Sequence, residues 1–142
     1  MNDPYNLKRF VDAQSGVFET ALAELRAGTK QTHWMWFVFP QLARLGRSST
    51  ARFYGINGRN EAGAYLAHPL LEARLREAVE TILPWAGKRS PLQILGAIDA
   101  MKLRSSLTLF DAMQPGDLFE RALNAFFDSP DEHTLALLDG AE

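Results

Sequence analysis

The side chains best suited to chemistry gather in residues 33–41, which read His-Trp-Met-Trp-Phe-Val-Phe-Pro-Gln and hold two of the three tryptophans of the chain. If this segment is helical, His33 and Trp36 lie on one face, because residues three apart are neighbours on a helix. A histidine can act as a general base near neutral pH, and an indole offers a flat surface on which a base, sugar or amide can stack. We therefore take His33 as a candidate catalytic base and Trp34, Trp36 and Gln41 as candidate ligand-binding residues. The alternative is that the aromatic segment is purely core.

A second group of chemically capable residues lies in residues 102–110, which combine two cations with three hydroxyl groups. Lys102 precedes Ser105 by three residues and Ser106 by four, so one helix face could hold an ammonium beside a hydroxyl. A lysine could activate a serine for nucleophilic attack, but this order reverses the familiar Ser-x-x-Lys pattern, so anion binding is favoured over a serine nucleophile. We take Lys102 and Ser105 as candidate catalytic residues and Ser106 as a ligand-binding one. The alternative is that these hydroxyls bond to the preceding helical turn.

Charge is distributed unevenly along the chain. Residues 25–60 carry +6 with no acidic residue, whereas residues 111–142 carry −7. The basic stretch either forms a local anion pocket or pairs loosely with the acidic one across the surface. Within it, Arg52 and Tyr54 are candidate ligand-binding residues. The total of −2 disfavours nucleic acid as a partner, because nucleic-acid-binding domains usually carry a strongly basic balance.

Several classes of protein find no support in the sequence. The chain has no cysteine, and its three histidines are too far apart for two to share a helix face, so we expect no metal site. Glycine-rich phosphate loops are absent, and we expect no cofactor. The longest strongly apolar run, residues 34–39, is too short to span a bilayer, so we expect no membrane partner. Together these features predict a soluble cytoplasmic protein, and they define no oligomeric state.

The hydrophobic pattern predicts helices throughout. Apolar residues recur at helical spacing, and Asp-Pro, His-Pro and Ser-Pro pairs mark helix starts. For residues 33–39 we favour a short buried helix over a buried strand, and residues 50–54 form either a helix or a strand. With 142 residues and no repeat or linker, the chain is predicted to be one all-α domain, residues 1–142, of about seven or eight short to medium helices. The main predicted helical stretches are 17–25, 33–39, 69–83, 91–95, 99–110, 117–126 and 130–138.

Five short blocks, in this order, resemble the signature of one protein family, DUF1810, a domain of unknown function. The blocks are His33-Trp34-Met35-Trp36-Phe37-Val38-Phe39-Pro40-Gln41, Leu45-Gly46-Arg47-Ser48, Tyr54-Gly55-Ile56, Tyr65-Leu66-Ala67-His68-Pro69 and residues 102–110. Together they cover nearly the whole chain. The resemblance implies a small, mainly helical domain and no established activity. Some members carry the label calpastatin, but a calpain inhibitor is a disordered repeat protein, whereas this chain has the apolar periodicity of a packed domain.

Two functions follow as hypotheses. The first is a pocket, lined by residues 33–41 and 102–108, that binds a small anionic or nucleotide-like ligand. Such a pocket could also hydrolyse the ligand or transfer a group on it, with His33 as the general base and Lys102 stabilising negative charge. The second is a non-enzymatic protein-interaction domain. The two are separated by geometry: the first requires His33, Arg52, Lys102 and Ser105 to converge on one concave surface.

Overall fold

The computed structural model describes residues 3–141 and confirms the all-α class. Within this range the chain forms ten α-helices, more than the seven or eight expected, and three of them have only four or five residues. One of these three, at residues 49–53, is the segment that the sequence pattern left open between helix and strand. Two 3₁₀-helices, η1 (Ala43–Leu45) and η2 (Leu83–Trp85), complete the secondary structure. The α-helices are α1 (Lys8–Gln14), α2 (Phe18–Ala27), α3 (Met35–Val38), α4 (Ser49–Phe53), α5 (Arg59–Ala67), α6 (Pro69–Ile82), α7 (Pro91–Leu95), α8 (Ala97–Met113), α9 (Leu118–Phe126) and α10 (Glu132–Ala141).

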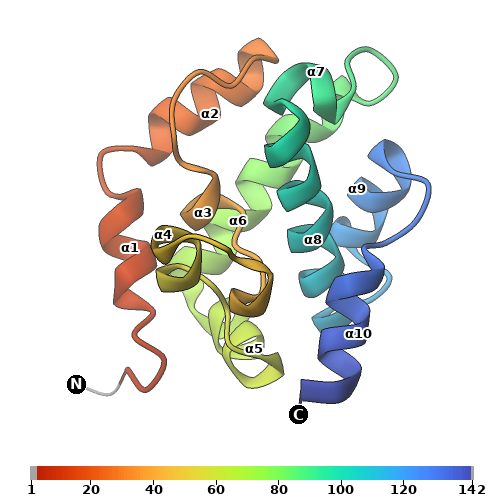
Figure 1. Cartoon of the computed structure of the whole chain (residues 1–142). Helices are drawn as coiled ribbons and strands as arrows, with labels where there is room; N and C mark the ends of the chain where they lie inside the picture. The colour runs from red at the N-terminus through yellow and green to blue at the C-terminus, as the bar shows by residue number, and fades with distance from the viewer. Residues whose placement is uncertain (1–2, 142) are drawn as a thin grey trace.

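Two long helices, α6 and α8, form the middle of the molecule, and the others pack around them (Figure 1). Helices α1, α2 and α5 contact α6, while α7, α9 and α10 contact α8. Their buried residues form one hydrophobic cluster that includes Phe10, Leu22, Leu75 and Leu107. No helix in residues 3–141 has both the length and the apolar character needed to cross a membrane.

Three of the predicted start and stop signals act as expected, whereas α1 begins at Lys8 and α10 at Glu132, later than the Asp3-Pro4 and Ser129-Pro130 pairs. Ser90 caps α7 with a complete capping box, in which its side chain accepts from the Gln93 backbone and the Gln93 side chain accepts from the Ser90 backbone. Nδ1 of His68 accepts from the Leu71 backbone, and Pro69 is the first residue of α6. Gly28 ends α2 at φ 74°, a left-handed conformation that glycine adopts without strain.

The aromatic segment forms α3, so the favoured helix is confirmed over the strand, but it spans a single turn before Pro40. Met35, Phe37, Val38 and Phe39 are buried there. This segment is therefore the centre of the core, as its apolar content suggests.

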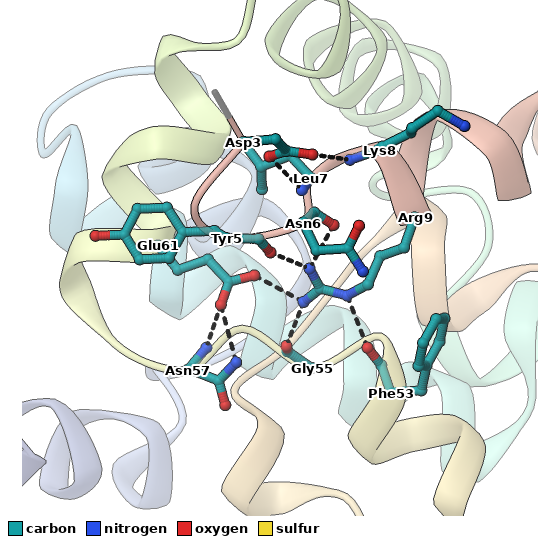
Figure 2. A network of polar contacts seen from close by, with 10 residues as sticks. All are labelled: Asp3, Tyr5, Asn6, Leu7, Lys8, Arg9, Phe53, Gly55, Asn57 and Glu61. Carbon is teal, nitrogen blue, oxygen red and sulfur yellow. Dashed lines mark hydrogen bonds and ion pairs between the residues drawn. The ribbon is translucent and has the colours of Figure 1, made fainter. Parts of the chain in front are cut away.

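A buried ion pair joins α1 to α5 (Figure 2). Nη2 of Arg9 lies 2.7 Å from Oε2 of Glu61, and the two side chains are 6% and 1% exposed. The guanidinium also donates to four backbone carbonyl oxygens, those of Tyr5, Asn6, Phe53 and Gly55. All five of its N–H donors are used, which is the condition under which a charge can be buried at tolerable cost. Oε1 of Glu61 accepts from the backbone and side-chain amides of Asn57.

The network holds a loop that pairs with the segment after α3. Leu42 and Ile56 form an isolated parallel bridge, in which the Ala43 backbone donates to Ile56 and the Ile56 backbone donates to Gln41. Gly55 approaches so closely that an added Cβ would lie 2.2 Å from Cα of Ala43. Only glycine fits this contact, and the backbone of residues 41–43 is fixed as a result.

Candidate functional site

A cavity of about 500 Å³ lies between α8, the segment from Gln41 to Ala51, and the start of α10. Its size is in the range typical of sites for small organic ligands. Helix α10 contacts both α8 and η1 beside it. Its lining residues are Gln41, Leu45, Gly46, Arg47, Ser48, Ala51, Ile98, Met101, Lys102, Ser105, Asp131 and His133.

One face of α8 supplies the first wall, because Ile98, Met101, Lys102 and Ser105 stand at i, i+3, i+4 and i+7. The wall changes in character along the helix. Ile98 and Met101 are 72% and 70% exposed and give it an apolar end. Lys102 follows, and Ser105 lies at the polar end beside α10.

Lys102 is held by one carboxylate and one indole. Its side chain is 19% exposed, its Nζ lies 3.6 Å from Oδ1 of Asp99, and it stands 5.0 Å from the centre of the Trp36 ring. Asp99 is also the partner of Lys30, whose Nζ lies 2.9 Å from Oδ2. Two lysines thus share one carboxylate in a half-buried place, and the cluster carries a net charge of +1. Positive charge with little solvent around it attracts anions more strongly than a fully hydrated surface lysine does.

Asp131 lies beside Ser105, at the end of the cavity away from Ile98, and hydrogen bonds hold it in place. Its Oδ2 accepts from the backbone and hydroxyl of Thr134, at 3.0 and 2.6 Å, and from the Ser105 hydroxyl at 3.3 Å. Its own backbone N–H donates to the hydroxyl of Thr108. The carboxylate therefore caps α10, and both its position and its rotation are fixed.

The second wall comes from the segment after Pro40. Gln41 sits at the bridge to Ile56, so the backbone from which its side amide projects is fixed. Arg47 is exposed and adds a second cation to the lining. The Ser48 hydroxyl accepts from the Ala51 backbone and caps α4.

Three of the nine predicted site residues line this cavity, namely Gln41, Lys102 and Ser105. Trp36 contacts Lys102 through its ring, and the centre of the His33 ring lies 6.5 Å from the centre of the same Trp36 ring. His33 is exposed and does not line the cavity, so the predicted catalytic base is not beside the predicted cation. Of the four residues required to converge, Lys102 and Ser105 line the cavity, whereas His33 and Arg52 do not.

Four predicted ligand-binding residues lie elsewhere. Trp34 has no exposed surface, and its indole N–H donates to Glu24, so no ligand can stack on it. Ser106 is buried in the core face of α8. Arg52 is exposed and donates to the backbone of Arg47, outside the cavity lining.

Tyr54 is the fourth, and it packs on Phe10 and Phe37 instead of lining the cavity. Tyr54 is thus a partly buried ring that packs against the core. Tertiary packing decides this, and it is not visible in the charge pattern that suggested Tyr54 as a ligand-binding residue.

Glu24 holds the segment before α3 in place through hydrogen bonds. Its carboxylate accepts from the Thr32 hydroxyl, the Gln31 and Thr32 backbones and the Trp34 indole. Partial burial acts to raise the pKa of Glu24, but these four hydrogen bonds outweigh it and lower the pKa to about 2. The ionised carboxylate therefore anchors Trp34 in the core.

The sequence arguments missed Arg47, Asp131, His133 and the apolar pair on α8. Asp131 carried a usable signal, because an Asp followed three residues later by Thr at a helix start is a capping pattern. Arg47 lies in the basic stretch but was not singled out, and Ile98, Met101 and His133 gave no local signal, since only the folded chain brings them to one cavity. Among residues 3–141 no three His, Asp or Glu side chains stand close enough together to hold a metal ion.

Comparison with known proteins gives a family and no activity. A search of curated proteins found no match. Among solved structures, the chain is similar to the conserved hypothetical protein Rv1873 from Mycobacterium tuberculosis, with 46% identity and a TM-score of 0.89 over 96% of this chain and 99% of that one. A family model described as "Protein of unknown function (DUF1810)" matches residues 4–138, which confirms the resemblance seen in the sequence. The chain therefore belongs to the DUF1810 family.

Proposed function

We propose that the cavity between α8 and α10 binds a small anionic ligand. The observation that carries the proposal is the placement of Lys102, a half-buried lysine whose ammonium makes no hydrogen bond within the described chain and lines the cavity. Asp99 orients this ammonium without neutralising the cluster, because it is shared with Lys30. An anion entering here meets a fixed positive charge with donors to spare.

The apolar end of the cavity suits a ligand that has an apolar part as well as a charged one. Ile98 and Met101 lie one helical turn from Lys102 and are largely exposed. Covering them with a ligand would remove apolar surface from water and add to the affinity. A nucleotide-like molecule has this combination of parts.

Catalysis in this cavity would depend on His133. His33 does not line the cavity, whereas His133 does, and an imidazole near neutral pH can move protons to or from a bound molecule. Binding is the primary proposal, and hydrolysis or group transfer with His133 as the acid or base is its extension.

The proposal is tested by measuring the thermal unfolding of the wild type and of Lys102→Met with increasing pyrophosphate. Pyrophosphate should raise the Tm of the wild type by mass action, and Lys102→Met should weaken its binding at least tenfold while shifting the ligand-free Tm little. Lys88→Met is the matched control, because Lys88 is exposed and lies outside the cavity. Equal binding by both variants would contradict the assignment of Lys102.

A second candidate, a protein-interaction domain, has one observation in its favour. Leu92, Ile98 and Met101 are large apolar residues exposed on α7 and the start of α8. Contiguous exposed apolar residues mark interaction surfaces in soluble proteins. If no anion raises the Tm of the wild type, and Ile98→Ser with Met101→Ser leaves stability unchanged, this candidate becomes the better one.

A further inference from the structure

We infer that the ligand of this cavity is a phosphate ester that carries hydroxyl groups, as a sugar phosphate does, with the phosphate at Lys102 and a hydroxyl at Asp131. The inference rests on the proposed function and names its ligand class. It comes from a feature that anion binding alone does not use, namely a carboxylate placed inside an otherwise cationic cavity.

One carboxylate oxygen of Asp131 is available to accept a hydrogen bond. Oδ2 takes all three hydrogen bonds that the side chain receives, from Ser105 and Thr134, while Oδ1 receives none from the described chain. An ionised carboxylate can only accept, so a ligand group that binds this oxygen is an O–H or N–H donor. A phosphate or carboxylate group cannot fill this role and would be repelled.

The net charge of the cavity favours a ligand with O–H donors over one with N–H donors. Lys102 and Arg47 are positive and Asp131 is negative, which leaves a net charge of +1 with His133 neutral. A zwitterion such as an amino acid brings an N–H donor but no net charge. A phosphate monoester brings a net negative charge and, when attached to a sugar or polyol, neutral hydroxyl donors as well.

The spacing along α8 fits a phosphate and a hydroxyl in one small molecule. Ser105, which contacts Asp131, follows Lys102 by three residues, which is about 4.5 Å along a helix axis. Lys102 and the contact of Ser105 with Asp131 therefore start from neighbouring turns of one helix and line the same cavity, so one small molecule that carries both groups can contact them together.

The decisive comparison uses sn-glycerol 3-phosphate and n-propyl phosphate, which have the same phosphate and the same carbon count but differ in two hydroxyl groups. We expect the wild type to bind glycerol 3-phosphate about tenfold or more tightly, the scale of a hydrogen bond to a charged acceptor, as measured by isothermal titration calorimetry. Lys102→Met should weaken both ligands alike.

Asp131→Asn supplies the second readout. Asparagine still caps α10, so the fold should be kept, which the ligand-free Tm checks. Removing the negative charge should strengthen the binding of n-propyl phosphate, while the advantage of glycerol 3-phosphate falls to less than about threefold. A purely electrostatic role for Asp131 would instead strengthen both ligands by the same factor.

The possible outcomes distinguish failure of this inference from failure of the proposed function. Equal affinity of the wild type for the two esters overturns the hydroxyl assignment but leaves an anion site in place if both bind. Failure of both esters and of pyrophosphate to bind overturns the proposed function itself. The wild-type comparison decides the matter even if Asp131→Asn does not fold.

Discussion

The sharpest stability prediction concerns the buried pair of Arg9 and Glu61. Glu61→Gln keeps the shape of the side chain but removes its charge. In either orientation the new amide N–H₂ faces donors, either the guanidinium of Arg9 or the two amides of Asn57, because both carboxylate oxygens now accept. The variant leaves the arginine charge buried, with only carbonyl oxygens as partners.

The magnitude follows from that geometry. Removing one partner of a buried pair costs about 3 to 5 kcal/mol. For 142 residues, an unfolding entropy of about 2.1 cal/mol/K per residue gives about 0.3 kcal/mol/K in total, so the Tm should fall by roughly 10 to 17 °C. Arg9→Met should cost more, because four backbone carbonyl oxygens lose their donor as well.

The assay is urea and thermal unfolding followed by circular dichroism, with Asp12→Asn as the control. Asp12 pairs with Lys8 at 2.7 Å, as short a contact as that between Arg9 and Glu61, but the two side chains are 61% and 73% exposed. Its loss should leave the midpoint within error, because exposed pairs contribute little. A loss below about 1 kcal/mol for Glu61→Gln would refute the argument that burial and full hydrogen bonding make this pair stabilising.

Three further predictions address other parts of the fold. The pKa of Glu24 is lowered to about 2 from 4.5, so its stabilising effect is complete above pH 4.5 and is lost as the pH falls through 2; Glu24→Gln should flatten the pH dependence of the Tm in this range. Gly55→Ala should lower both the Tm and the affinity for pyrophosphate, since the new Cβ would displace Ala43 and with it the wall at Gln41. Leu107→Ala should cost about 2 to 5 kcal/mol in urea unfolding, because this side chain is buried between α8 and its neighbours.

Helix positions could be predicted from the sequence wherever local chemistry sets them. The Ser90-Pro91 and His68-Pro69 starts and the Gly28 stop lie where the pattern placed them, since caps depend on a few neighbouring residues. The sequence favoured a helix at residues 33–39 but did not show that it would be a single turn, and the bridge at Leu42 was not predicted, because long-range packing stabilises both.

The candidate site residues divide in the same way, into those set by local spacing and those set by tertiary packing. Lys102 and Ser105 were found because both lie on one helix face, which periodicity defines. Trp34 was misplaced because its burial depends on Glu24, ten residues earlier and on another helix. His133 was missed because only the folded chain brings α10 beside α8.

A ligand bound in the cavity would link parts of the chain that are distant in sequence, as a disulfide does. Without cysteine there is no disulfide to link distant parts of the sequence. The walls of the cavity come from residues near 47, near 102 and near 131, which are far apart along the chain. A molecule held by all three would close two long loops at once, acting as a removable cross-link. Hydrogen exchange should then slow in all three segments together when the ligand binds, and the protein would be most rigid only in its presence.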